Sequence, residues 1–199
     1  MSKIKNYDSI FNQYGGVMRR CELTKEGISY QILQDLINEG CVEKIKYGYY
    51  QWQDEKAFTE VSVITALFPE AIICDLSAAM YYGYTDRVPG VWHIAVDNKT
   101  ARNKFKLDFP QIKPHFINAD RLDIGISEGN IDGITVKIYD RERLICDCLR
   151  HVNTIDGEIF NTIIQRYVID KNKDAARLMV YAEKWGVEKK ARRMIGIWL

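Results

Sequence analysis

The side chains that most often carry metal or acid–base chemistry are spread far apart along this chain. It has three histidines, His93, His115 and His151, and none has a second His or Cys at the short spacing of a zinc site. His93 alternates with Trp92 and Ile94 in a stretch typical of a β-strand, which favours a structural histidine over a ligand. The spacing therefore predicts neither a metal site nor a cofactor.

The motifs of phosphoryl and nucleotidyl transfer do not occur in the sequence either. There is no glycine-rich phosphate-binding loop, and no Gly-Ser followed by a spaced Asp-x-Asp pair that would hold two metal ions. A nuclease of the Asp…Glu-x-Lys kind would need an acid two residues before Lys137, where the chain has Thr135. We therefore expect no catalysis. The enzymatic alternative is a nuclease-like domain whose motif is not recognisable.

Composition is that of an ordinary soluble globular protein. Of the 199 residues, 47% are hydrophobic and 28% are charged, and the net charge is only +1. Any affinity for nucleic acid must therefore come from local clusters of charge. The odd number of cysteines, without a CxxC pair, fits reduced thiols, and no segment resembles a signal peptide or a membrane span. We expect a cytoplasmic protein.

Residues 14–52 are the best candidate for a binding surface, because their pattern is helix, tight turn, helix and hairpin. A short helix is predicted over 17–26. Ser29 is an N-cap candidate for a second helix over 29–39, and a hairpin that turns at Gly48 follows it. This is the plan of a winged helix-turn-helix, in which the second helix usually reads DNA.

The side chains predicted to contact DNA lie on the second helix, on the helix before it and on the hairpin. Gln on a reading helix pairs with adenine, while Lys, Arg and Tyr beside it suit phosphate contacts. The predicted contact residues are Arg19, Arg20, Lys25, Ser29, Tyr30, Gln31, Gln34, Lys44, Lys46, Tyr47 and Tyr49. The alternative interpretation is an ordinary solvated face, since residues 1–52 hold seven basic and six acidic residues.

Two later segments also concentrate positive charge. One is a basic loop or helix at 99–106, and the other is the last predicted helix, at 187–199. Their basic residues, which form a candidate second patch for phosphate contacts, are Lys99, Arg102, Lys104, Lys106, Lys189, Lys190, Arg192 and Arg193. The alternative for the last helix is a solubilised terminal helix that docks its apolar side on the core.

A charged segment follows the strongest predicted strand, which covers 131–139. Asp140 is an N-cap candidate for the next helix, where Arg143 and Asp147 lie four residues apart and so share one face. The segment is either a surface for a partner or for DNA, or a helix start stabilised by surface ion pairs. We favour the second interpretation.

The order of elements predicts an α+β protein with two domains. Residues 1–56 form the winged helix-turn-helix domain, and residues 57–199 form a larger mixed α/β domain. In the second domain, strands are expected at about 70–139 and helices at about 140–199. A helix capped by Ser77 and strands at 92–96 and 122–126 are among the expected elements.

Four stretches, taken in order, resemble the AbiEi antitoxins of AbiE-type (type IV) bacterial toxin–antitoxin systems. They are LINEGCVEKIKYGYY in the first domain, FP followed shortly by ICDLSAAMYYG, then ITVKIYDRERLICDCLR, and LMVYAEKWGV before the basic C-terminal helix. Together they span nearly the whole chain, and their order and spacing carry the resemblance.

The resemblance implies an N-terminal winged helix that represses its own promoter by binding inverted repeats in double-stranded DNA. It also implies a C-terminal domain that neutralises a nucleotidyltransferase-like toxin encoded next to it. Two molecules, or a dimer formed on DNA, would read the two half-sites. The missing nucleotidyltransferase motif agrees with the antitoxin role. A protein-only adaptor that binds the toxin directly is a further alternative.

Overall fold

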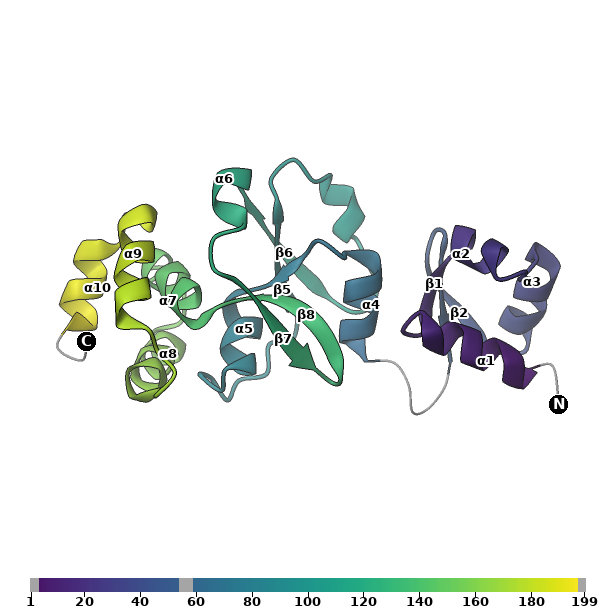
Figure 1. The fold of residues 1–199 in the computed structure, drawn as a ribbon, viewed down its shortest axis with the longest axis horizontal. Coiled ribbons are helices and arrows are strands. Elements are labelled where there is room, and N and C mark those ends of the chain that lie inside the picture. The colour runs from purple at the N-terminus through teal and green to yellow at the C-terminus, as the bar shows by residue number, and fades with distance from the viewer. Residues whose placement is uncertain (1–3, 54–58, 197–199) are drawn as a thin grey trace. The chain divides into compact units, whose positions relative to one another are not determined.

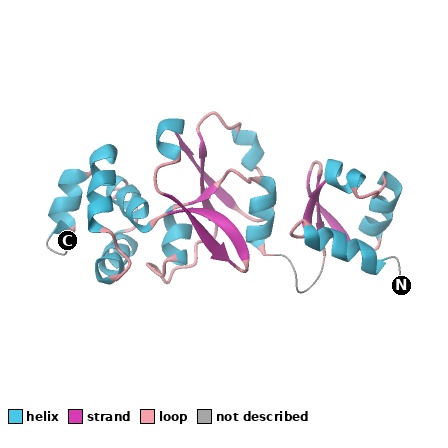
Figure 2. Ribbon diagram, viewed as in Figure 1, coloured by secondary structure: helices cyan, strands magenta, loops and turns pink. Residues whose placement is uncertain are grey.

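The structure is a computed structural model that describes residues 4–53 and 59–196. It is an α+β protein whose described residues form helices and two β-sheets, which confirms the predicted class (Figure 1 and Figure 2). The chain divides into two compact units. The first contains the residues up to Glu70 together with 106–111 and 130–134, and the second contains the rest. The domain boundary predicted between residues 56 and 57 lies outside the described residues.

The first unit combines helices with a small antiparallel sheet. Its elements in chain order are α1 (Ile4–Gln13), β1 (Val17–Arg19), α2 (Arg20–Lys25), α3 (Tyr30–Asn38), β2 (Val42–Lys46), β3 (Tyr49–Trp52) and α4 (Glu60–Leu67). Strand β3 lies between β1 and β2 and pairs with both in antiparallel fashion.

Helix α3 forms where the sequence predicts it. The Ser29 hydroxyl accepts a hydrogen bond from the Ile32 N–H at 3.2 Å, so it caps one of the free donors at the helix start. Leu33 and Leu36 are buried in the core of this unit, together with Trp52 of the hairpin. The apolar face of α3 is thereby fixed against the rest of the unit, while its opposite face is exposed.

The predicted helix over 17–26 is wrong in its first part, because that part is strand β1. Met18 pairs with Tyr50 of β3, and α2 begins at Arg20, directly after β1 ends at Arg19. Gly15 and Gly16 precede the strand with φ values of +68° and +82°, a conformation that glycine adopts without steric cost. They turn the chain back onto the hairpin, which is a long-range pairing that a local helical pattern does not reveal.

The second unit is built on a larger mixed sheet. The elements from β4 to β8 are β4 (Ile72–Ile73), α5 (Asp75–Tyr81), β5 (Trp92–Asp97), the 3₁₀ helix η1 (Arg102–Phe105), β6 (Ile112–Ile117), α6 (Ala119–Leu122), β7 (Ile126–Ile131) and β8 (Ile134–Tyr139). The strand order is β6-β5-β4-β8-β7. Strand β5 is antiparallel to β4 and parallel to β6, and β4 is parallel to β8.

Two details of this unit differ from the sequence predictions. Ser77 does not cap α5 but lies buried inside it, where its hydroxyl accepts the His93 N–H at 2.9 Å. The strand predicted at 122–126 is absent from the described residues, because α6 occupies 119–122 and β7 starts at Ile126. In both places a tertiary contact or a tight turn overrides the local pattern.

The C-terminal part is helical, as predicted. It contains α7 (Arg141–Arg150), α8 (Gly157–Ile169), α9 (Ala175–Trp185) and α10 (Glu188–Met194). Asp140 caps α7 by accepting the Arg143 N–H at 2.8 Å, which confirms the predicted N-cap. The end of the last helix as predicted, residues 197–199, lies outside the described residues. Every helix that the structure describes is too short or too polar to traverse a lipid bilayer.

Candidate functional site

The start of α3 and the tip of the β2–β3 hairpin meet around one arginine. The Arg20 N–H donates to the Gly48 carbonyl in the hairpin turn at 2.8 Å. Its guanidinium carbon lies 5.7 Å from the centre of the Tyr30 ring at the start of α3, and its Nη1 donates to the Ile28 carbonyl at 3.4 Å. Arg20 therefore ties together the three segments that the sequence assigns to DNA contact.

The hairpin presents an exposed cation beside an exposed aromatic ring. Lys44 Nζ lies 5.6 Å from the centre of the Tyr47 ring, and Tyr47 is 90% exposed. Tyr30 on α3 is 63% exposed. A cation next to an exposed tyrosine hydroxyl is suited to contact with the phosphate backbone of a nucleic acid. Arg20, Tyr30, Lys44 and Tyr47 are hereafter called the α3–hairpin surface.

Several other predicted contact residues are engaged within the protein. Ser29 serves as the cap of α3, and Gln31 donates to Asp35 at 3.1 Å. The Arg19 side chain lies 3.5 Å from the Glu22 carboxylate, and Lys46 Nζ lies 5.9 Å from the centre of the Phe68 ring. These contacts engage Arg19 and Lys46 within the first unit.

Tyr49 is half-buried and packs against the cluster of Val17, Val63 and Leu67, so the structure uses it for packing. Of the remaining predicted contacts, Lys25 is exposed and Gln34 is half-buried on α3. The α3–hairpin surface is thus smaller than the predicted set.

The predicted second basic patch consists of separate pieces. On α10, Lys190 Nζ donates to the Leu149 carbonyl at 3.1 Å and Arg192 bonds Glu188 at 3.0 Å. Lys189 and Arg193 are exposed and lie four residues apart, on one face of the helix. They are the side chains of α10 best placed to meet a phosphate.

In the other piece, the Arg102 guanidinium carbon lies 4.3 Å from the centre of the Phe116 ring. Lys99 and Lys104 are exposed nearby in the chain, and Lys106 belongs to the first compact unit. The structure thus keeps 99–106 largely as exposed charge.

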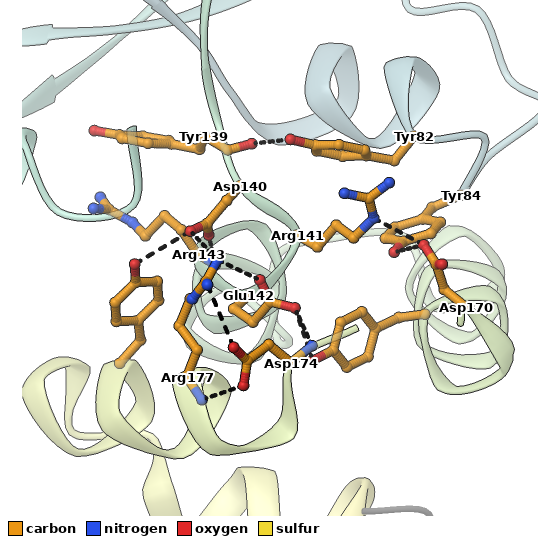
Figure 3. Close-up of polar contacts among 12 residues, drawn as sticks. Tyr82, Tyr84, Tyr139, Asp140, Arg141, Glu142, Arg143, Asp170, Asp174 and Arg177 are labelled. Atoms are coloured by element: carbon orange, nitrogen blue, oxygen red, sulfur yellow. Dashed lines mark hydrogen bonds and ion pairs between the residues drawn. The ribbon is translucent and has the colours of Figure 1, made fainter. Parts of the chain in front are cut away.

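The start of α7 is the centre of a polar network that joins the sheet to α8 and α9 (Figure 3). Arg141 Nε donates to Asp170 at 2.9 Å, and the Tyr84 hydroxyl donates to the same carboxylate at 2.7 Å. The Glu142 carboxylate accepts the Asp174 N–H at 2.8 Å. The network thus connects segments that are far apart in the sequence.

Arg143 lies in the interior, so the expectation that it forms a surface ion pair is wrong. Its side chain is 1% exposed and its guanidinium carbon lies 4.1 Å from the Tyr139 ring centre and 4.0 Å from that of Trp185. Nε donates to Asp147 at 3.0 Å, and Nη1 donates to the carbonyls of Arg121 and Ile124 at 2.9 and 2.7 Å. A cation this deeply buried is stable only because its donors are paired.

The carboxylate that pairs with Arg143 is also fixed by another hydrogen bond. Asp147 also accepts the indole N–H of Trp185 at 3.0 Å. Burial raises the pKa of Asp147, and the charge and hydrogen bond of Arg143 act in the opposite direction. Gly125 lies against the arginine, because a Cβ at this position would come within 2.6 Å of the Arg143 Cβ. This arrangement anchors α7 to the sheet.

All three histidines of the chain line one cavity of the second unit. This cavity, of about 350 Å³, is lined by His93, His115 and His151 together with Asp75 and Asp147. A neighbouring cavity of about 300 Å³ shares Asp75, His115, Asp147 and His151 and adds the cations Arg121 and Arg150. The residues that seemed scattered in the sequence therefore meet in the fold.

Within this cavity, Asp75, His93 and His115 make direct contact and are hereafter called the histidine–aspartate cluster. His93 Nδ1 lies 3.0 Å from Asp75 Oδ2 and 3.0 Å from His115 Nε2, and His115 Nε2 lies 3.5 Å from Asp75 Oδ2. Burial lowers the pKa of His115 to about 4. Burial acts to raise the pKa of Asp75, but the hydrogen bond and charge of His93 outweigh it, so the pKa is lowered. At neutral pH the Asp75 carboxylate is therefore ionised and the His115 ring is neutral.

This cluster is not apparent in the sequence, because its members are brought together by strand pairing. Asp75 follows β4, His93 lies on β5 and His115 lies on β6. In the parallel β5–β6 register, His93 pairs with Lys113, so His115 is two residues further along and on the same face. The two-residue spacing of Lys113 and His115 indicates that they share one face of a strand. The register that aligns β6 with β5 cannot be read from the sequence of either strand.

No protein-family model and no curated protein sequence matches this chain. Among solved structures, it is similar to the crystal structure of the RV2827C protein from Mycobacterium tuberculosis. The two are 13% identical, with a TM-score of 0.50, and the match covers 95% of this chain and 78% of that chain. At this identity the likeness concerns the fold, so what this chain shares with that protein is its architecture.

Proposed function

We propose that the first unit is a winged helix-turn-helix module that binds double-stranded DNA, and that the chain is an AbiEi-type antitoxin that represses its own promoter. The observation that carries the DNA-binding part is the α3–hairpin surface. There the exposed start of a rigidly packed helix and an exposed hairpin tip are joined through Arg20. In winged-helix proteins the second helix lies in the major groove and flanking segments contact the backbone.

Positive charge clustered at the binding surface, and not the net charge of the protein, would supply the affinity for DNA. The net charge is only +1, so the cations that matter are those at the surface that faces the DNA. In this proposal Arg20 and Lys44 contact phosphates, and the exposed start of α3, with Tyr30, enters the groove. Two copies on an inverted repeat would place two such helices about one helical turn apart, roughly 34 Å.

The antitoxin part of the proposal rests on the sequence resemblance. In this account the second unit neutralises a nucleotidyltransferase-like toxin encoded next to this gene. The first unit would serve regulation, so the two activities would occupy different units. The alternative functions make different predictions. An adaptor would need the first unit for contact with the toxin. A nuclease-like enzyme would cleave DNA in the presence of a divalent metal ion.

The proposal predicts that repression and neutralisation can be separated by mutation of the α3–hairpin surface. Arg20→Ala with Lys44→Ala should relieve repression of a reporter driven by the chain's own promoter, because two phosphate contacts are lost. The same variant should still rescue growth of cells that express the neighbouring toxin. Lys171→Ala with Lys184→Ala, which removes two exposed lysines of the second unit, is the matched control and should retain both activities. Loss of rescue together with loss of repression would contradict the division of roles.

A second prediction concerns the exposed cations of α10. If they contact phosphate, Lys189→Ala with Arg193→Ala should lower the magnitude of the slope of log affinity against log salt by about 1 to 2, because each contact contributes about 0.9. Lys190 and Arg192 are left in place, since each has a partner within the protein. Fluorescence anisotropy with duplex DNA measures the slope. An unchanged slope would restrict the interface to the first unit.

A further inference from the structure

We propose that Asp75, His93 and His115 bind a divalent transition-metal ion of the zinc class. The three atoms that face one another, one carboxylate oxygen and two imidazole nitrogens, are the donor types that such ions prefer. They come from the start of α5 and from strands β5 and β6, so the fold of the second unit, and not a local sequence motif, assembles the site.

The spacing of the three atoms suits a single ion. Asp75 Oδ2, His93 Nδ1 and His115 Nε2 lie 3.0, 3.0 and 3.5 Å from one another. An ion held tetrahedrally at about 2.0–2.2 Å from each ligand separates the ligands by roughly 3.3–3.6 Å. A small outward movement of the side chains would therefore open the triangle to the coordination distance.

Hydrogen bonding does not satisfy this arrangement as well as a cation does. His93 Nδ1 approaches both Asp75 Oδ2 and His115 Nε2 at 3.0 Å, but a ring nitrogen carries at most one hydrogen. That hydrogen can point directly at only one of the two neighbours, so the other contact lacks a well-directed hydrogen bond. An ion placed among the three atoms would accept a lone pair from each of them.

The ligands are also held firmly from behind. His93 is buried in β5, and its backbone N–H is bound by the buried Ser77 hydroxyl at 2.9 Å. Asp75 adopts a positive φ of +48°, a conformation that Asp tolerates better than most residues and that lets its carboxylate meet the histidines. Such preorganisation lowers the cost of assembling a coordination shell.

Three protein ligands leave a coordination position for water or for a ligand. Asp75 and His115 line both cavities described above, so an ion at the cluster would face them. His151 also lines both cavities, but it does not belong to the group of atoms within 4.8 Å of one another. This difference offers a control in which another histidine of the same cavity is changed.

The test is metal binding by the full-length protein after removal of metal with a chelator. Equilibrium dialysis followed by elemental analysis should find one equivalent of Zn²⁺ on the wild type, whereas Mg²⁺ should not compete, because imidazole is a poor ligand for it. His115→Gln and Asp75→Asn should each weaken binding by at least about 100-fold, a loss no smaller than that seen when supporting residues are removed. His151→Gln should retain one equivalent.

Co²⁺ binding to the wild type tests the site without depending on whether a variant folds. Co²⁺ bound to the wild type should give visible d–d absorption that Zn²⁺ abolishes by displacement. Asn at position 75 keeps the tolerance for positive φ, and circular dichroism checks that the variants fold. The proposal is overturned if the wild type binds neither ion, if Mg²⁺ binds as tightly as Zn²⁺, or if folded His115→Gln binds Zn²⁺ like the wild type. Loss of Zn²⁺ from His151→Gln equal to that from His115→Gln would overturn the three-ligand assignment.

Discussion

Replacing Arg143 with Met is expected to lower the free energy of unfolding by about 3–5 kcal/mol. The guanidinium group is almost fully buried between the rings of Tyr139 and Trp185, and it bonds one carboxylate and two backbone carbonyls. Met would fill most of the volume but leave the Asp147 charge and both carbonyls without these donors. An unpaired charge in the interior costs far more than a lost surface ion pair. Chemical denaturation of the two proteins measures the difference.

Two further variants separate this effect from a general sensitivity of α7 and its neighbours. Arg177→Met removes a guanidinium group that lies within 4.0 Å of Asp140, Glu142 and Asp174, but the arginine side chain is 50% exposed (Figure 3). Solvent screens such pairs, so the loss should be no more than about 1 kcal/mol.

The double variant Arg143→Met with Asp147→Asn should be more stable than Arg143→Met. It removes the buried charge and retains an oxygen that accepts the Trp185 N–H. A loss below about 1 kcal/mol for Arg143→Met would show that the buried pair does not anchor α7.

Replacing Arg20 and Lys44 with Ala is expected to weaken binding to promoter DNA by roughly 10- to 100-fold at about 0.1 M salt. Two phosphate contacts would be lost, so the magnitude of the slope of log affinity against log salt should also fall by about 2. Both cations lie beside exposed aromatic rings on the α3–hairpin surface. Fluorescence anisotropy at several salt concentrations measures both quantities.

Stability and net charge must be controlled in this experiment. Arg20 also donates to the Ile28 carbonyl, although at 3.4 Å this is a long hydrogen bond. A thermal unfolding curve of the variant shows whether the first unit is intact. Lys171→Ala with Lys184→Ala removes the same charge from exposed positions in the second unit and should leave the affinity and the slope unchanged. Equal weakening by both pairs would point to non-specific attraction.

Features with a local physical cause could be predicted from the sequence. Ser29 and Asp140 were recognised as caps because a short polar side chain precedes an apolar helical pattern, and both bonds are found. The strand at 92–96 was predicted by alternation and β-branching, and β5 covers Trp92–Asp97. The α+β class follows from the order of such elements.

Features that depend on pairing between distant segments could not be predicted. Strand β1 is held by β3, so residues 17–19 form a strand although their local pattern suggests a helix. The histidine–aspartate cluster depends on the register of β5 against β6 and on the turn into α5. Arg143 was expected at the surface because a charged residue is rarely buried, and its aromatic neighbours lie on other elements.

The salt dependence of binding between the full-length protein and its own upstream DNA tests directly whether the first unit reads DNA. Anisotropy titrations of a duplex that contains the inverted repeat should show saturable binding at low salt, with affinity that falls linearly on a log–log plot. A duplex of equal length and scrambled sequence should bind more weakly at every salt concentration. Absence of binding to either duplex at low salt, or equal affinity for both, would contradict the assignment of the first unit as a sequence-reading DNA-binding module.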